Sequence, residues 1–157
     1  MTISSSSASP EKDYFNCVQD NQKIQKKRFK VLVAAMYGSG DSFMLEILKG
    51  TNIKLEFMRN TINPSFDGIG PEPIEENLKD LKSRVKKEKF DLGIALDGDA
   101  DRIAAVAPGG IFIHPQKILG LLALHLHQDR AWRGGIVKTI AGTTMIDHIA
   151  SFLKAKL

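Results

Sequence analysis

The apolar run FKVLVAAM, residues Phe29–Met36, constrains the fold of this chain more than any other stretch. It is continuous and rich in residues that favour β structure, which is typical of a strand buried in a parallel sheet. Parallel strands need long crossover connections, and these are usually helices. If strands and helices alternate along the rest of the chain, the run therefore predicts an α/β layer fold.

Two glycines after this strand indicate a turn into a helix. Gly38 and Gly40 indicate a tight strand-to-helix connection. A helix N-terminus after such a turn can also cradle an anion, but the plain structural connection is the favoured interpretation. We expect Asp41 or Ser42 to cap the helix and Gly50 to end it.

The alternation continues to the end of the chain. We expect, in order, a strand at Asn52–Asn60, an irregular loop at Thr61–Pro73, a helix at Ile74–Glu88, a strand at Phe90–Leu96, a hairpin of Ile103–Ala107 and Ile111–His114, a largely buried helix at Gln116–Gln128, a strand at Gly135–Ile140 and a helix at Thr143–Lys154. This order predicts a three-layer α/β/α domain with a mainly parallel mixed sheet, followed by the truncated strand–helix start of a second, similar domain.

The boundaries that we expect divide the chain into four parts. Residues 1–12 form a Ser-rich flexible leader, residues 13–28 a lead-in helix or linker, residues 29–131 the α/β/α domain, and residues 132–157 the start of the next domain. The loop before the second helix should expose an apolar surface around Ile62, Phe66 and Ile69 if no other domain covers it.

Composition excludes several classes of protein. The net charge of +4 comes from lysines scattered along predicted helix faces, with few aromatic residues among them, which argues against nucleic-acid binding. No apolar run is long enough to span a membrane, and the polar N-terminus lacks the apolar core of a secretory signal. The single cysteine, Cys17, excludes an internal disulfide and suits a reducing compartment. We therefore expect a cytoplasmic location.

The candidate site is the stretch DLGIALDGDADR, in which a predicted strand runs into Asp97, Asp99 and Asp101. Ligands of open α/β sheets bind at the carboxyl ends of strands. Alternate residues of an extended loop can point one way, so three carboxylates can converge on one cation. Three hard oxygen ligands favour Mg²⁺, with Ca²⁺ or Mn²⁺ as alternatives, and leave positions for water or a phosphate oxygen. Arg102 adds a planar fork suited to a phosphate.

Other interpretations of the aspartates remain open at this point. A polar turn with Arg102 paired to one aspartate is the simplest. An EF-hand does not fit, because the sixth and twelfth positions from Asp97 are Arg102 and Pro108 rather than glycine and glutamate. A phosphatase of the haloacid-dehalogenase type also places Asp-x-Asp after a strand and would use Asp97 as its nucleophile, but it carries that motif on its first strand.

The sequence resembles the α-D-phosphohexomutase family, which comprises phosphoglucomutases, phosphomannomutases and phosphoglucosamine mutases. DLGIALDGDADR is similar to the metal loop of that family, and NPSFDGIGPEPIEENLKDL and KVLVAAMYGSGDSFMLEIL are similar to flanking parts of its second domain. IFIHPQKILGLLALHL resembles the element that follows. GIVKTIAGTTMIDHIASFLKAKL resembles the start of the third domain.

The resemblance implies a reversible transfer of phosphate between the 1- and 6-positions of a hexose, through a phosphoserine and a sugar bisphosphate. It implies that Asp97, Asp99 and Asp101 bind Mg²⁺, that Arg102 lies near the transferring phosphoryl group, and that Lys138 contacts substrate.

The family's phosphoserine motif, Thr-Ala-Ser-His-Asn-Pro, and its sugar-recognition motif, Glu-x-Ser-Gly-His, do not occur in the chain. We therefore expect a domain fragment with no catalytic nucleophile of its own, inactive alone, whose partners are domains I, III and IV of the same enzyme and its hexose phosphate substrate. A small phosphatase and a non-catalytic metal-binding module are the alternatives.

Overall fold

The computed structural model describes residues 28–157, so the expected leader and nearly all of the lead-in segment lie outside the described residues. Its centre is a five-stranded sheet in the order β2-β1-β3-β4-β5. The strands are β1 (Phe29–Ala34), β2 (Ile53–Met58), β3 (Leu92–Leu96), β4 (Ile103–Ala107) and β5 (Ile111–Ile113). β1 pairs in parallel with both β2 and β3, whereas β4 is antiparallel to β3 and to β5. Only β4 therefore runs against the other strands, and the predicted mainly parallel mixed sheet is confirmed.

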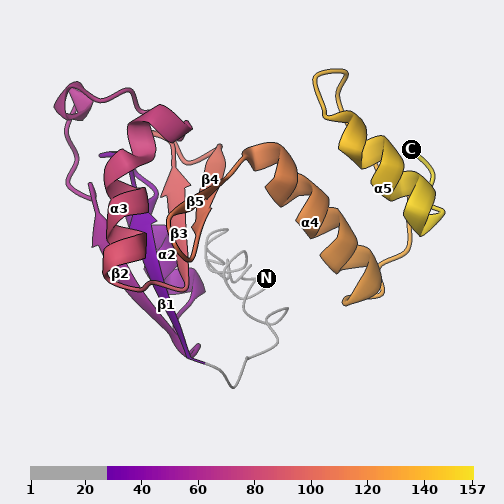
Figure 1. Cartoon of the computed structure of the whole chain (residues 1–157), viewed down its shortest axis with the longest axis horizontal. Helices are drawn as coiled ribbons and strands as arrows, with labels where there is room; N and C mark the ends of the chain where they lie inside the picture. The colour runs from indigo at the N-terminus through magenta and orange to yellow at the C-terminus, as the bar shows by residue number, and fades with distance from the viewer. Residues whose placement is uncertain (1–27) are drawn as a thin grey trace, which may run out of the picture.

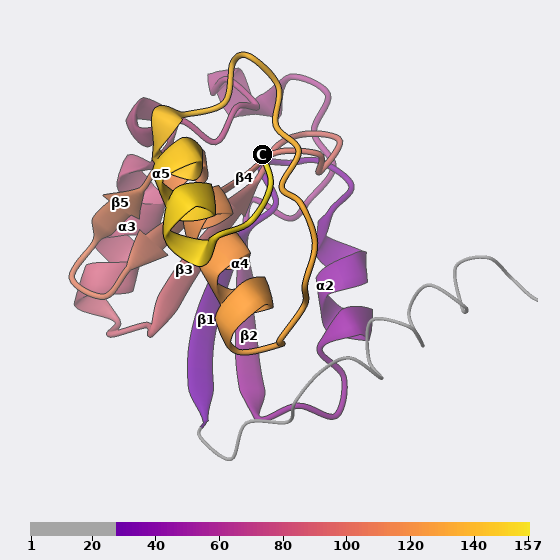
Figure 2. The same cartoon turned by 90° about the vertical axis from the view of Figure 1, so that its right-hand side faces the viewer.

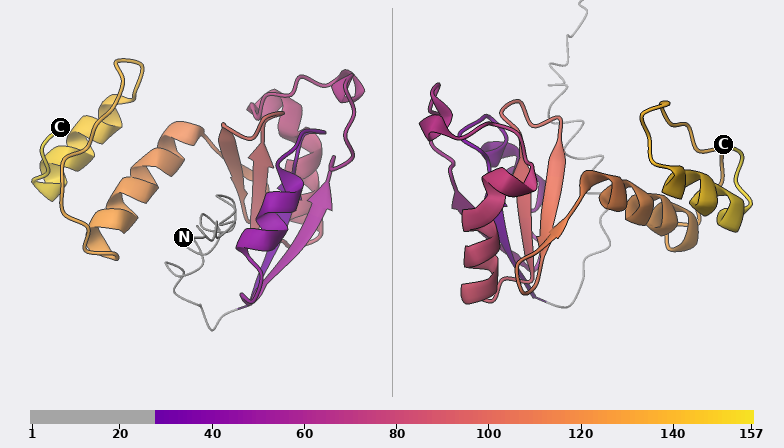
Figure 3. Two further views of the ribbon diagram at one scale, coloured as in Figure 1. Left: turned by 180° about the vertical axis from the view of Figure 1, so that it is seen from behind. Right: turned by 45° about the horizontal axis from the view of Figure 1, so that its top comes forward.

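Helices cover both faces of the sheet. Helix α3 (Lys79–Lys87), which follows the short 3-10 helices η1 (Phe66–Gly68) and η2 (Glu75–Leu78), lies on one face, and α2 (Asp41–Ile47) lies on the opposite face (Figures 1 and 3). The three-layer α/β/α prediction is thus confirmed. The predicted side-chain cap of α2 is wrong, because the N-cap position is Gly40, which has no side chain, and Asp41 is already helical.

The main core lies between α3 and the sheet. It is made of completely or almost completely buried apolar side chains from η2, α3, the strands and residues next to the strands: Leu32, Ala34, Met36, Leu78, Leu81, Val85, Phe90, Ala95, Ala104 and Val106. Gly93 on β3 allows close approach, because a Cβ atom there would lie 2.7 Å from Val85 Cγ2. This core fixes β3 in the middle of the sheet, and β3 in turn carries the candidate site at its carboxyl end.

Helix α4 (Pro115–Gln128) differs from the prediction of a largely buried helix. It leads away from β5 and packs against α5 (Thr144–Leu153), so that the two helices form a pair beside the sheet (Figures 1 and 2). Gly120 is the buried residue of α4, and a Cβ atom there would meet Met145 Cε at 2.8 Å. Helix α4 also contacts β4, but Leu119, Leu121 and Leu122 remain 46–59% exposed.

The predicted strand at Gly135–Ile140 is wrong. This segment is irregular and is not part of the five-stranded sheet. A β-strand needs a neighbouring strand to pair with, and the backbone hydrogen bonds here, from Ile136 N–H to Lys156 O at 2.7 Å and from Gly142 N–H to Thr139 O at 2.9 Å, do not form a strand ladder. Val137 and Ile140 are consequently fully or almost fully exposed. The helix predicted after it is present as α5. The domain boundary near residue 132 remains a prediction.

Candidate metal centre in the β3–β4 loop

The three aspartates lie in the short loop between β3 and β4, at the carboxyl end of β3. The loop is closed by hydrogen bonds from Asp97 N–H to Arg102 O and from Ala100 N–H to Asp97 O, each 3.2 Å long. Ala100 adopts a left-handed backbone conformation with φ 62°, which turns the chain back toward β4. This tight turn therefore allows the side chains of Asp97, Asp99 and Asp101 to lie close together.

The carboxylates of Asp97, Asp99 and Asp101 converge as the sequence predicts. Each offers an oxygen atom, and these oxygens lie within 4.8 Å of one another. Asp97 is completely buried, whereas Asp99 and Asp101 are exposed. A set of three hard oxygen donors on one side of a loop fits Mg²⁺, Mn²⁺ or Ca²⁺ and leaves positions for further ligands.

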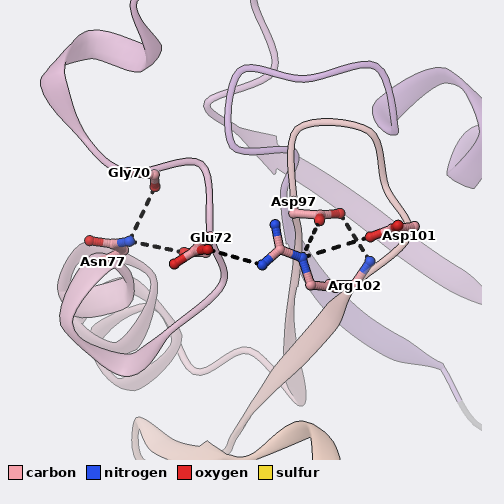
Figure 4. A network of polar contacts seen from close by, with 6 residues as sticks. All are labelled: Gly70, Glu72, Asn77, Asp97, Asp101 and Arg102. Carbon is pink, nitrogen blue, oxygen red and sulfur yellow. Dashed lines mark hydrogen bonds and ion pairs between the residues drawn. The ribbon is translucent and has the colours of Figure 1, made fainter.

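Arg102 is bound into the same cluster (Figure 4). Its backbone N–H donates to Asp97 Oδ1 at 3.0 Å, and its Nε donates to Asp97 Oδ2 at 2.6 Å. Its Nη1 donates to Glu72 Oε1 at 3.1 Å, and its Nε lies 3.7 Å from Asp101 Oδ1. The guanidinium is therefore the positive charge that offsets the aspartates in this arrangement.

The pKa values of Asp97 and Asp101 are shifted in opposite directions. Burial alone would raise the pKa of Asp97, but hydrogen bonds from the Arg102 backbone and side chain, aided by one from Asp101, bring this pKa below its ordinary value. The pKa of Asp101 is raised by its hydrogen bond with Asp97 and by repulsion from Asp99 and Asp97. The pKa of Arg102 is raised by its bonds to Asp97 and Glu72. The cluster thus places the carboxyl groups of Asp97, Asp99, Asp101 and Glu72 around a single guanidinium.

The glycine turn after β1 supports this loop directly. A Cβ atom at Gly38 would lie 2.2 Å from Gly98 O, and one at Gly40 would lie 2.7 Å from Leu96 Cδ1. Ser39 N–H donates to Gly98 O at 3.2 Å. The Gly38–Gly40 turn is thus a packing surface for the aspartate loop, which agrees with the structural interpretation rather than the anion-binding one.

The segment before η2 covers the other side of the loop. Phe66 lies over Gly98, because a Cβ atom there would be 3.3 Å from Phe66 Cε1. Asn77 Nδ2 donates to Glu72 O at 3.0 Å and to Gly70 O at 3.2 Å, which fixes the stretch that carries Glu72 (Figure 4). The predicted apolar surface is therefore smaller than expected: Ile62 is 83% exposed, but Phe66 and Ile69 are partly buried, with Ile69 packed on the main core.

Lys138 is not brought to the aspartates. Its Nζ donates to Asp147 Oδ2 at 2.9 Å and to Thr143 O at 3.4 Å, so it is held by α5, which lies on the far side of α4 from the sheet (Figure 1). Its contact with substrate, which rests on the resemblance, stays a prediction.

Glu72 is the member of the site that sequence reasoning missed. It lies 30 residues from Arg102 and in a different loop. The acidic residue between two prolines in PEP was the available signal, but nothing local connects it to the aspartates. The same contacts argue against Asp97 as a phosphatase nucleophile, because its carboxylate is buried and both oxygens accept hydrogen bonds from Arg102.

Comparison with known proteins identifies relatives of the chain. Residues 12–110 match the family model described as phosphoglucomutase/phosphomannomutase, alpha/beta/alpha domain II. The chain is 33% identical over 138 residues to the phosphoglucomutase/phosphomannomutase of Thermococcus kodakarensis, an alignment that covers 88% of the chain and 30% of that protein. It is 38% identical over 99 residues to the phosphoglucosamine mutase of Campylobacter concisus, which covers 62% of the chain and 21% of that protein.

A solved structure shows the same fold. The crystal structure of a phosphoglucomutase/phosphomannomutase family protein from Burkholderia thailandensis superimposes with a TM-score of 0.80 at 23% identity, over 93% of this chain and 32% of that one. The chain thus spans less than a third of the length of each of these relatives. Among residues 28–157, no helix combines the length and apolar character needed to cross a membrane.

Proposed function

The chain belongs to the phosphoglucomutase/phosphomannomutase family through its α/β/α domain II, and on this basis we propose that its β3–β4 loop is the metal-binding loop of a phosphohexomutase. The observation that carries the proposal is the convergence of the Asp97, Asp99 and Asp101 oxygens within 4.8 Å at the carboxyl end of β3. Mg²⁺ is the ion that we propose, because the donor set consists of hard oxygens and leaves positions free for phosphate.

The reaction to which this loop would contribute is the transfer of a phosphoryl group between the 1- and 6-positions of a hexose phosphate. A metal ion at the three aspartates would stabilise the charge of the transferring group. The chain's own residues would hold the ion with three carboxylates and place the Arg102 guanidinium beside it. Glu72 would orient that guanidinium through its bond to Nη1.

The 157 residues contain no Thr-Ala-Ser-His-Asn-Pro motif and no Glu-x-Ser-Gly-His motif. We therefore propose that catalysis by this family's route requires domains I, III and IV in addition to these residues, and that the 157-residue chain alone binds metal without turning over hexose phosphates. The proposed compartment is the cytoplasm, which suits the single cysteine of the chain.

The test is a titration of the chain with Mg²⁺, followed by the backbone amide signals of residues 97–102 in NMR spectra. We expect saturable shifts confined to this loop and its contacts at the Gly38–Gly40 turn. Asp99→Asn is the matched variant, because Asp99 is exposed and can lose its charge without disturbing the fold. Shifts that persist unchanged in Asp99→Asn would place the ion elsewhere and refute the proposal.

A further inference from the structure

The Asp97 carboxylate is closed to a metal ion in the arrangement that the structure shows. Its side chain is 0% exposed, and its two oxygens accept the Arg102 N–H at 3.0 Å and the Arg102 Nε at 2.6 Å. Asp99 and Asp101, by contrast, are exposed. A cation that binds all three carboxylates therefore needs an opening at Asp97.

Of the two Arg102 groups bonded to Asp97, only the guanidinium can leave without moving the backbone. The Arg102 backbone is held because its carbonyl also accepts the Asp97 N–H at 3.2 Å and because β4 begins at the next residue. The Arg102 side chain is 55% exposed. It has a second anchor outside the cluster, since its Nη1 bonds Glu72, which is itself half exposed.

We infer that Arg102 and a divalent cation occupy Asp97 by turns: the guanidinium holds the empty site closed and withdraws toward Glu72 when the ion binds. This inference rests on the proposed function, because it assumes that the aspartates bind a metal. In the empty site the guanidinium supplies the positive charge that a buried carboxylate needs. In the loaded site the ion supplies it, and Arg102 keeps Glu72 as its partner.

Removal of the Arg102 side chain should change the metal affinity in opposite directions, depending on whether Arg102 positions the ligands or competes with the ion. If Arg102 positioned the ligands, its loss would weaken metal binding. If it competes for Asp97, its loss removes both the competitor and a nearby like charge, so binding becomes tighter. Glu72 provides the matched control, because Glu72→Gln alters the outer contact of the same guanidinium but leaves Asp97 covered.

The experiment is isothermal titration of Mg²⁺ at pH 7.5 and fixed low salt into the chain and its Arg102→Gln, Glu72→Gln and Asp99→Asn variants. We expect the dissociation constant of Arg102→Gln to fall by about tenfold, since charge-assisted hydrogen bonds are among the stronger ones. Glu72→Gln should change it by about twofold at most, because exposed ion pairs contribute little. Equal or weaker binding by Arg102→Gln would overturn the inference.

The two proposals fail in distinguishable ways. Binding by the unaltered chain with no gain in Arg102→Gln would refute the inference and keep the metal site. Binding by Arg102→Gln alone would refute metal binding by the unaltered chain and with it the exchange, because the ion would never displace the guanidinium. Silence from every variant would refute both.

A second measurement uses the unaltered chain and therefore does not require that any variant folds. The Arg102 Nε–H signal, observed in protein labelled with ¹⁵N arginine, should shift on Mg²⁺ saturation as its bond to Asp97 is lost. An Arg102 Nε–H signal that stays unchanged while the loop amides saturate would contradict the exchange.

Discussion

Replacing Gly38 by alanine tests whether the turn after β1 supports the aspartate loop. The added Cβ atom would lie 2.2 Å from Gly98 O, 2.6 Å from Gly98 Cα and 2.7 Å from Gly98 C, all backbone atoms. Ordinary contacts of a Cβ atom begin near 3.4 Å, so one of the two loops must move by about 1 Å or more. Overpacking of this kind typically costs about 1–3 kcal/mol.

The assay has two parts. Urea unfolding should show a free energy of unfolding lowered by about 1–3 kcal/mol, and Mg²⁺ titration should show weaker binding, because the displaced residue lies between Asp97 and Asp99. Gly134→Ala is the control, since a Cβ atom there meets nothing within 4 Å, and its stability should lie within about 0.5 kcal/mol of the unaltered chain.

Gly38→Ala with unchanged stability and unchanged Mg²⁺ affinity would refute the packing that we describe. A loss of stability in Gly134→Ala equal to that in Gly38→Ala would show instead that any glycine replacement is harmful. Gly38 does not adopt a left-handed backbone conformation, so the expected effect of alanine comes from the steric clash and not from backbone strain.

Three further predictions follow from the core and the cluster. Leu81→Ala, which empties part of the main core, should lower the free energy of unfolding by about 2–5 kcal/mol in urea titrations, and a loss below 1 kcal/mol would contradict its complete burial. Asp97→Ala should lower the free energy of unfolding of the metal-free chain by about 1–3 kcal/mol, whereas Asp99→Ala, at an exposed position, should change it by less than about 0.5 kcal/mol. Equal losses of stability in thermal unfolding would contradict the different burial of the two residues. The pKa of Asp97 is lower in the native state than in the unfolded chain, so the native state binds fewer protons in this pH range. The stability that this carboxylate contributes is therefore present above the unfolded pKa of about 3.9 and is lost as the pH falls through the folded pKa. The stability gap between the chain and Asp97→Asn should therefore narrow from pH 6 toward pH 3, and a constant gap would contradict the shift.

Local sequence patterns were sufficient for the sheet and for the convergence of the aspartates. Apart from Lys30, the run Phe29–Met36 is apolar because β1 is an inner strand of the sheet, between β2 and β3. The alternation of Asp97, Asp99 and Asp101 with small residues determines a short loop, so their proximity needs no distant partner. Both features are properties of neighbouring residues, which is why the sequence predicts them.

Features that depend on distant contacts could not be predicted in this way. The apolar composition of α4 indicates burial, but which elements cover it depends on tertiary packing, and in residues 28–157 its neighbours are α5 and β4. The residues at 135–140 have strand propensity and lack a neighbouring strand in the sheet. The bond from Arg102 to Glu72 joins loops that are separated by η2, α3 and β3.

The most direct test of the metal site is a crystal structure of the chain grown with Mn²⁺, a divalent ion with similar oxygen preference and a measurable anomalous signal. We predict one strong anomalous peak in contact with carboxylate oxygens of Asp97, Asp99 and Asp101, with the Arg102 guanidinium displaced from Asp97. An ordered β3–β4 loop without a peak at saturating Mn²⁺, or a peak held by other residues, would contradict the metal-binding role of this loop.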